Sequence, residues 1–257
     1  MGRSVRRRQR AQCRPPQSAI RRSTYAHVVD ISSRGAIIVT GSTGLIGSVI
    51  CPRLRNIGYE VLELDLSLGD DLNDESFVEE YFRDHKAEAL VNLFARNHHV
   101  SEGVPVLGFL DVSLESFDDF LRTNVTSLFS VCREYIRNNK TGSIVNLSSI
   151  YGLRSPRPDL YGTGHKHPGY GASKAAVISL TQFLARHAAP DFSINCVVLG
   201  GIVDRQSGDF VTRYTEQVPM GRMATPDDLL PVIEMLIRTD SKYISGSTIL
   251  VDGGLTA

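Results

Sequence analysis

The sequence lacks two features that would decide its class at once: a long apolar run and a closely spaced cysteine pair. No segment approaches the roughly 20 consecutive apolar residues that cross a bilayer, although 42% of the 257 residues are hydrophobic. The four cysteines, Cys13, Cys51, Cys132 and Cys196, form no CxxC pair, which argues against a disulfide framework or a zinc site. We therefore expect a cytoplasmic, non-membrane, metal-free chain that buries one core.

Net charge is also missing, because 28 basic residues balance 28 acidic ones. The balance hides an asymmetry: residues 1–34 hold nine arginines and a single acid, Asp30. The remainder has 19 basic and 27 acidic residues, a formal charge of −8, which argues against a nucleic-acid-binding body. Residues 1–34 are expected to be a basic extension: a disordered tail, a presequence for an organellar matrix, or an anion-binding arm.

From residue 35 onward, short runs of Val, Ile and Leu alternate with segments of helical period. This alternation predicts βαβ units around a parallel sheet that is buried on both faces. Strands are expected at 36–41, 60–65, 89–95, 142–149, 192–201 and 247–254, and helices at 45–58, 74–85, 114–138, 170–189 and 225–238, the last with Thr225 as N-cap and Pro226 at its first position. We predict a single α/β domain, 35–257, whose doubly wound sheet binds ligands at the strands' carboxyl ends.

A glycine-rich turn connects the first predicted strand to the first helix. Gly41, Gly44 and Gly47 recur every three residues, which permits a tight turn, close approach of a pyrophosphate, and close packing of helix on strand. The whole expected cofactor loop is Gly41, Ser42, Thr43, Gly44, Leu45, Ile46 and Gly47.

Asp65 lies 18 residues beyond Gly47, at the end of the second predicted strand. A carboxylate there can accept hydrogen bonds from the adenosine ribose and would repel a 2′-phosphate. The sequence therefore favours NAD(H), with NADP(H) as the alternative cofactor. The other interpretation of Asp65 is a residue that caps a loop.

Tyr170 and Lys174 are four residues apart at the start of a predicted helix and so share one face. A tyrosine pKa of about 10 is too high for easy proton exchange near neutrality. A nearby ammonium favours the phenolate and lowers that pKa. The pair is therefore a candidate acid/base unit, although such a pair taken alone is more often a surface feature.

Other polar residues occur where such chemistry needs them. Ser148 and Ser149 end a predicted strand, where a hydroxyl can hold a substrate carbonyl oxygen or simply terminate the strand. Asn124 interrupts an apolar helical stretch, and a buried amide needs hydrogen-bond partners. Asn124 could anchor a water chain toward Lys174, or satisfy neighbouring backbone groups.

From about Gly35 to Ala257 the sequence resembles the short-chain dehydrogenase/reductase family. The resemblance rests on TGSTGLIG, the DL pair Asp71 and Leu72, RTNVTSLF, IVNLSSIYG, YGASK, INCVVLGGI and YISGSTILVDGG. It implies a three-layer α/β/α Rossmann-type fold and an NAD(P)-dependent oxidoreductase that interconverts a secondary alcohol and a ketone. A homodimer or homotetramer is also implied.

The resemblance also assigns roles. Tyr170 would be the general acid/base, Lys174 would lower its pKa and bind the nicotinamide ribose, Ser149 would polarise the carbonyl, and Asn124 would position a relay water. The further cofactor-binding residues implied are Asp71, Leu72, Asn92, Gly200 and Ile202. The glycine spacing matches a longer sugar-nucleotide branch, so an epimerase or dehydratase is one alternative. A non-catalytic dinucleotide-sensing regulator is another.

Twenty residues separate Ser149 from Tyr170, and the segment LRSPRPDLYGTGHKHPG (153–169) within them is rich in turn formers. We call 153–169 the insert and expect it to overhang the active site. Its cations, with those after the third strand, suggest a sugar-like or other polar anionic small-molecule substrate; the alternative is a solvated loop. The candidate substrate-contacting residues are Arg96, Tyr151, Arg154, Arg157, His165 and His167. The insert is similar to that of dehydrogenases in bacterial surface-sugar and flagellin-modification pathways.

Overall fold

The computed structural model describes residues 34–97, 108–161 and 164–257. The expected basic extension, except Arg34, and the cationic pair His98 and His99 therefore lie outside the described residues. Arg34 itself is part of the fold, because its guanidinium bonds to Glu234 at 3.1 Å and lies over the Tyr59 ring. Among the described residues, no helix is both long and apolar enough to span a membrane.

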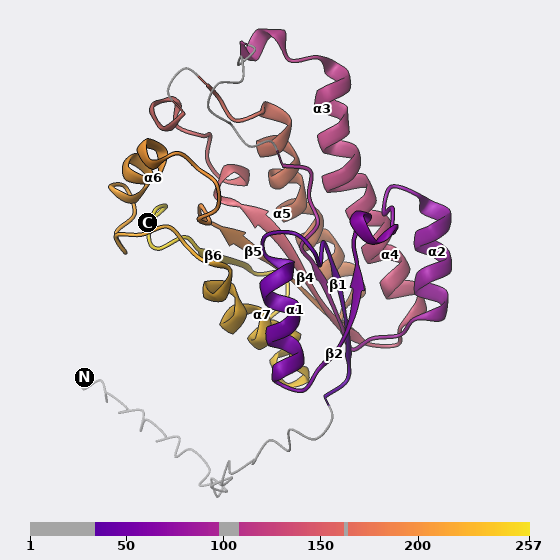
Figure 1. The fold of residues 1–257 in the computed structure, drawn as a ribbon. Coiled ribbons are helices and arrows are strands. Elements are labelled where there is room, and N and C mark those ends of the chain that lie inside the picture. The colour runs from indigo at the N-terminus through magenta and orange to yellow at the C-terminus, as the bar shows by residue number, and fades with distance from the viewer. Residues whose placement is uncertain (1–33, 98–107, 162–163) are drawn as a thin grey trace, which may run out of the picture. The chain divides into compact units, whose positions relative to one another are not determined.

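A parallel sheet forms the centre of the domain (Figure 1). Within the described ranges it has six strands in the order β2-β1-β3-β4-β5-β6, and every neighbouring pair is parallel. The strands are β1 Ala36–Thr40, β2 Glu60–Leu64, β3 Ala89–Asn92, β4 Gly142–Ser149, β5 Phe192–Leu199 and β6 Thr248–Val251. Each corresponds to a predicted strand.

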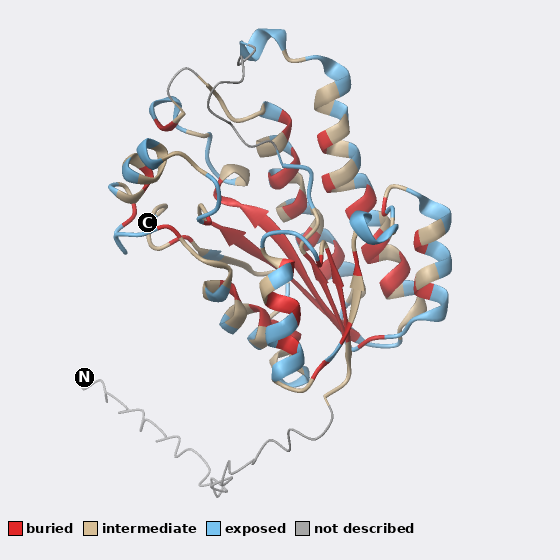
Figure 2. Cartoon of the chain, in the orientation of Figure 1, coloured by how far each residue is buried: buried red, intermediate tan, exposed pale blue. Residues whose placement is uncertain are grey.

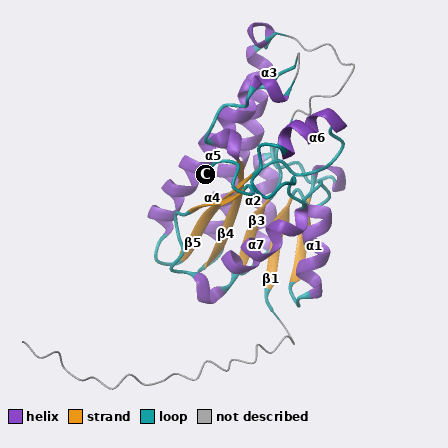
Figure 3. Cartoon of the chain, turned by 90° about the vertical axis from the view of Figure 1, so that its left-hand side faces the viewer, coloured by secondary structure: helices purple, strands orange, loops and turns teal. Residues whose placement is uncertain are grey.

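Helices cover both faces of the sheet, which leaves its central strands buried (Figures 2 and 3). Helices α1 and α7 pack on one face through a cluster that includes Ile50, Leu54 and Ile233. Helices α2, α4 and α5 pack on the other through a cluster that includes Phe82 and Tyr135. The helices are α1 Gly47–Asn56, α2 Glu75–Asp84, α4 Leu128–Asn138, α5 Pro168–Ala188 and α7 Leu230–Ile237. The three-layer α/β/α fold is confirmed.

The long helix predicted for 114–138 is not uniform. Helix α3, Leu114–Leu121, passes into a π-helical turn, Arg122–Ser127, before α4 begins. The π turn contains Asn124, and such turns occur frequently at functional sites. Periodicity alone could not reveal it, because the apolar pattern continues on both sides.

Two helix starts show how local chemistry sets the boundaries. Helix α5 begins two residues earlier than expected, at Pro168, because the His167 side chain accepts a hydrogen bond from Gly169 N and acts as N-cap. Thr225 is the N-cap and Pro226 the first helical residue, as the sequence predicts, although the first turn is a 3₁₀-helix, Pro226–Leu229. Asp228 completes a capping box with Thr225. Helix α6, Gly208–Thr215, was not predicted; Ser207 caps it.

The strand order places a crevice between the carboxyl ends of β1 and β3, because β2 lies on one side of β1 and the later strands on the other. Gly41 follows β1 and has φ +69°, a conformation that favours glycine. A Cβ atom on Gly41 would lie only 2.5 Å from Phe94 N, in the segment after β3. The two strand ends therefore meet at this glycine.

Candidate active site

The glycine loop between β1 and α1 fits a dinucleotide. A Cβ on Gly47 would lie 2.5 Å from the Ser42 carbonyl oxygen, so only glycine lets the helix start against the loop. Gly44 has room, since its nearest neighbour would be 3.4 Å away. Ser42 Oγ is buried without a hydrogen-bond partner among the described residues, which is the state expected of a polar atom that awaits a ligand group.

Asp65 connects the end of β2 to the glycine loop. Its carboxylate accepts hydrogen bonds from Thr43 N at 3.2 Å and Ser67 N at 2.9 Å, and it caps a short 3₁₀-helix, Leu66–Leu68. Asp65 therefore has the capping role that was the other interpretation of this residue. Partial burial alone would raise the pKa of Asp65, but these hydrogen bonds hold it below its usual value. The carboxylate is thus ionised at neutral pH beside the loop.

Three further residues predicted to bind the cofactor, Asp71, Leu72 and Asn92, differ in their exposure and in their contacts. Asp71 is exposed and its carboxylate accepts from Asn73 N at 2.9 Å. Leu72 packs into the core. The Asn92 amide donates to Asn146 Oδ1 at 2.8 Å and accepts from Thr40 Oγ1, so it is enclosed in a buried network. The side chains of Leu72 and Asn92 are thus taken up by the core.

Gly200 and Ile202 follow β5, next to the end of β4. Leu199 pairs in register with Ser149, so the Gly200–Ile202 segment begins beside the predicted catalytic serine. Gly201 N donates to the hydroxyl of Tyr214. Ile202 is buried and forms a β-bridge with Ala224.

Tyr170 lies in the first turn of α5 and Ser149 at the end of β4. Burial raises the pKa of Tyr170 to about 12, while a hydrogen bond with the Ser149 side chain acts in the opposite direction. Ser148 is structural, since its hydroxyl donates to Lys174 O at 2.7 Å. The structure therefore brings Ser149, rather than Ser148, to the tyrosine.

Lys174 is buried and its Nζ lies 5.9 Å from the centroid of the Tyr170 ring. It donates to Leu147 O at 2.9 Å, and burial lowers its pKa to about 8. The sequence suggested that this ammonium would lower the pKa of the phenol. In the structure burial dominates instead, and the pKa of Tyr170 is raised.

Asn124 is bonded on every side. Its Oδ1 accepts from Arg96 N at 2.7 Å, and its Nδ2 donates to Arg96 O at 3.1 Å and Ser173 Oγ at 2.9 Å. Two of these bonds satisfy backbone groups of Arg96, and the third reaches the Ser173 side chain. They join the segment after β3 to α5 within one turn of Tyr170.

The expected cationic rim is not assembled from the predicted residues. Arg157 is exposed and pairs with Asp159. Arg154 donates to the Thr256 carbonyl. Arg96 forms an ion pair with Asp119 at 3.4 Å. Three of the predicted substrate cations are therefore engaged by the protein itself.

The remaining predicted substrate residues are aromatic rings. His167 caps α5 and stacks on Phe120 with 4.4 Å between centroids. Tyr151 accepts a 2.6 Å hydrogen bond from the Tyr161 hydroxyl. His165 Nε2 is buried without a hydrogen-bond partner in the described ranges, so of these three it is the one with an open polar atom.

Lys166 is one of the insert cations expected at the substrate rim, but it was not among the candidate substrate-contacting residues. Its Nζ lies 4.5 Å from the centroid of the Tyr170 ring, closer than that of Lys174, and donates to Asn97 Oδ1 at 2.6 Å. Burial, then the charge of Lys174, lowers its pKa to about 8. The sequence contains a signal for this contact, because Lys166 precedes Tyr170 by four residues, just as Lys174 follows Tyr170 by four.

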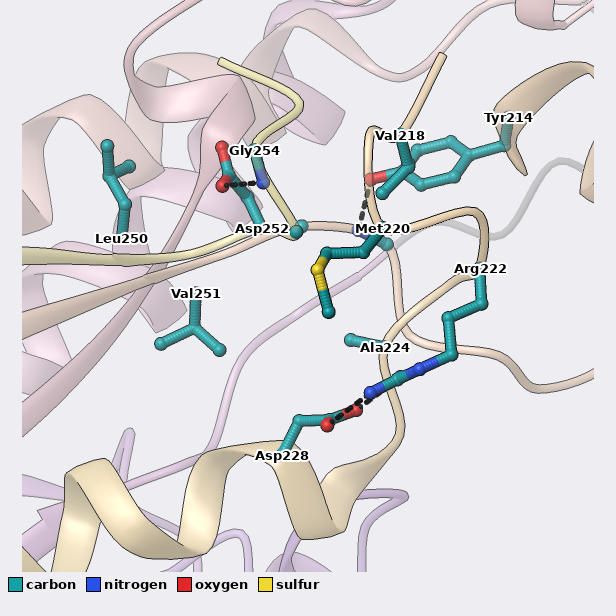
Figure 4. A pocket seen from close by; sticks show the side chains of 13 residues that line it. Tyr214, Val218, Met220, Arg222, Ala224, Asp228, Leu250, Val251, Asp252 and Gly254 are labelled. Carbon is teal, nitrogen blue, oxygen red and sulfur yellow. Dashed lines mark hydrogen bonds and ion pairs between the residues drawn. The ribbon is translucent and has the colours of Figure 1, made fainter. Parts of the chain in front are cut away.

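A pocket of about 280 Å³ is lined in part by Gly200 and Gly201 (Figure 4). Tyr214, Arg222 and Asp252 help line it, whereas Tyr170 does not. Arg222 and Asp228 form an ion pair across it, 2.7 Å apart. Across the described part of the chain, no three His, Cys, Asp or Glu side chains are placed to hold a metal ion.

Comparisons with known proteins agree with this architecture. A family model described as enoyl-(acyl carrier protein) reductase matches residues 53–256. Acetoacetyl-CoA reductase of Acinetobacter sp. is 26% identical over 253 residues, 88% of this chain and 99% of that protein. The 3-oxoacyl-(acyl-carrier-protein) reductase FabG of Rickettsia bellii is 29% identical over 251 residues, 89% and 99% of the two chains.

A crystal structure of a short-chain dehydrogenase from Leptospira borgpetersenii with bound NAD⁺ superposes with a TM-score of 0.79. The identity is 26%, and the match covers 89% of this chain and 95% of that one. The named reductases act on acyl compounds, so they do not support the sugar-like substrate. This chain belongs to the short-chain dehydrogenase/reductase family and is an NAD(P)-dependent oxidoreductase acting on carbonyl or hydroxyl groups.

Proposed function

We propose that the chain interconverts a ketone and a secondary alcohol with NAD(H), and that Tyr170 is the general acid/base. The observation that carries this proposal is the position of the Tyr170 ring in the first turn of α5, flanked by two lysines, together with Ser149, which ends β4 and acts on the pKa of the phenol. The bound dinucleotide would supply hydride chemistry. The protein would supply the proton and hold the substrate oxygen.

Each residue has a physical task in this proposal. Ser149 holds the carbonyl oxygen of the substrate within reach of the phenol. Tyr170, whose pKa is about 12, carries its proton at neutral pH and donates it to that oxygen during reduction. Lys174 and Lys166 place positive charge near the phenol, which favours the phenolate that remains. Asn124 keeps α5 in place through Ser173.

NAD(H) is the proposed cofactor rather than NADP(H). The support is Asp65, whose hydrogen bonds keep it ionised beside the glycine loop, where it would repel a 2′-phosphate. The bound NAD⁺ in the Leptospira relative is consistent with this preference.

We propose a small ketone of the 3-oxoacyl type as substrate, because the relatives of nearly equal length are named as reductases of acetoacetyl-CoA and 3-oxoacyl-(acyl-carrier-protein). A homodimer or homotetramer is the proposed assembly. Phe129 on α4 and Phe183 on α5 support it, since both expose apolar rings on helices of the same layer.

The test compares the wild type with Tyr170→Phe, and uses Tyr243→Phe as a control because Tyr243 is fully exposed. Loss of the acid/base should lower kcat for NADH-dependent reduction of acetoacetyl-CoA by at least about 100-fold, while calorimetry shows an unchanged NADH Kd. The wild type should bind NADH more tightly than NADPH. Retained turnover in Tyr170→Phe would refute the role of Tyr170.

A further inference from the structure

Tyr214, on α6, packs directly against the segment that follows β5 (Figure 4). Its side chain is buried, and its hydroxyl accepts a hydrogen bond from Gly201 N. A Cβ on Gly201 would lie 2.7 Å from Tyr214 Cζ, and one on Gly200 would lie 3.2 Å from the Tyr214 hydroxyl. The absence of side chains at both glycines is what lets the ring approach the main chain.

The same ring also contacts the substrate side of the molecule. Tyr214 shares a small hydrophobic cluster with Leu160 of the insert, and with Val218 and Met223. Phe210 stacks on Tyr214 with 5.8 Å between centroids, and Tyr161 of the insert lies 5.5 Å from Phe210. The insert is thus joined to Gly201 through a continuous row of rings.

Polar contacts follow the same path. Arg213, adjacent to Tyr214, donates to Leu160 O at 3.3 Å. At the other end, Tyr161 donates to Tyr151, whose backbone N–H is bonded to Ser149 Oγ. The insert is therefore bonded directly to the helix that carries Tyr214, and it is linked to the proposed catalytic serine through Tyr151.

We propose that Tyr214 is a positioning residue for dinucleotide binding, which holds Gly201 and hence Ile202 in the conformation that receives the nicotinamide end. This inference rests on the proposed function, because it takes the Gly200–Ile202 segment as part of the cofactor site. Without the hydroxyl, Gly201 N loses its acceptor inside the protein, and the segment is free to turn toward other partners. Tyr214 itself need not touch the cofactor.

Tyr214→Phe keeps the ring in its cluster and removes the hydroxyl alone. We expect the calorimetric Kd for NADH to rise by about 5- to 20-fold, with a parallel rise in KM for NADH. At saturating NADH, kcat should change by less than about twofold, because Tyr170 and Ser149 are untouched.

Tyr135→Phe is the matched control. Tyr135 is also a fully buried tyrosine whose hydroxyl bonds to the backbone, at 3.0 Å from Ala87 O, but it lies near the amino end of β3. We expect Tyr135→Phe to lower Tm as Tyr214→Phe does and to leave the NADH Kd unchanged. A structural role alone would move Tm in both variants and the Kd in neither.

Leu160→Ala provides a second variant that leaves Tyr214 intact and loosens its packing from the insert. Its NADH Kd should rise by about 2- to 5-fold. The inference is overturned if both site variants bind NADH as the wild type does, or if Tyr135→Phe weakens binding equally. Failure of the proposed function would look different, because the wild type itself would then bind neither NADH nor NADPH.

Discussion

The two sides of the active site use their polar residues in opposite ways. The glycine loop follows β1, Ser149 ends β4, and Tyr170 and Lys174 lie in α5, each within the element that its motif predicts. In the insert, residues predicted to contact the substrate are instead engaged by the protein: Arg157 pairs with Asp159, and His167 caps the start of α5. The difference shows that motif position locates a side chain better than residue charge does.

The physical reason lies in what each side must satisfy. A strand end inside a covered sheet has its main chain already paired, so its last side chains are free to face the crevice. An irregular segment must instead supply its own caps and ion pairs from its side chains. Lys166 departs from that pattern, since it reaches the Tyr170 ring.

The largest effect that would sharpen this comparison is expected at the glycine loop. In Gly47→Ala the new Cβ would lie 2.5 Å from a main-chain oxygen, so we expect about 1–3 kcal/mol of destabilisation. The NADH Kd should rise by at least about tenfold, because the loop that receives the pyrophosphate must shift. Urea unfolding and calorimetry measure the two quantities.

Gly208→Ala is the control for this substitution. Gly208 is also the first residue of a helix, α6, and a Cβ there would meet nothing within 4 Å. The free energy of unfolding of Gly208→Ala should differ from that of the wild type by less than about 0.5 kcal/mol. The NADH Kd of this variant should be unchanged. Wild-type NADH affinity in Gly47→Ala would remove the glycine loop from the cofactor site.

An intermediate effect is expected at Lys166. The pKa of this ammonium is about 8, so it is charged below pH 8 and loses its charge as the pH rises through that value. In the direction of alcohol oxidation the phenolate is needed, and a cation above the ring favours it. Lys166→Gln should therefore lower kcat/KM by about fivefold at pH 7 and by less than about twofold at pH 9.5.

Lys166→Arg retains a charge at both pH values and serves as the control for that profile. It should keep most of the activity at pH 7. A loss in Lys166→Gln that is the same at pH 7 and pH 9.5 would show that Lys166 acts by packing rather than by charge.

The smallest effect is expected at Arg157, which the sequence placed among the substrate contacts. Because it is exposed and already paired with Asp159, Arg157→Gln should change KM for an anionic ketone by less than about twofold. Steady-state kinetics with acetoacetate and acetoacetyl-CoA measure this. A tenfold rise in KM would support the cationic rim and would contradict the difference between the strand ends and the insert.

The sheet could be predicted because each strand is a short apolar run that only a doubly covered sheet can bury. The N-cap at Thr225 could be predicted as well, since its pattern with Pro226 is local. Helix α6 was not predicted because its packing depends on Leu160, which contacts Tyr214 from 54 residues earlier in the sequence.

The residues of the candidate site also divide into those that the sequence could predict and those whose environment depends on distant segments. Gly47 could be selected from spacing, because the atoms that a Cβ there would meet belong to the loop just before it. The same spacing marks Gly41, although the atom that its Cβ would meet, Phe94 N, belongs to a distant segment. Asn92 could not be separated from a cofactor ligand by sequence, because its partner Asn146 belongs to a neighbouring strand. The rise in the pKa of Tyr170 likewise depends on burial by distant segments, which no four-residue interval records.

The π-helical turn at Arg122–Ser127 has a consequence for anyone who redesigns or superposes this region. Its hydrogen bonding admits an additional residue without ending the helix, and Ser127 Oγ donates to the Arg122 carbonyl that the widened turn leaves accessible. If an ordinary α-helix replaced this stretch, the residues would shift by one position along the helix. The Asn124 side chain would then rotate by about 100° around the helix axis. Its amide would then point away from Arg96, although every hydrophobic contact of α3 could still be kept.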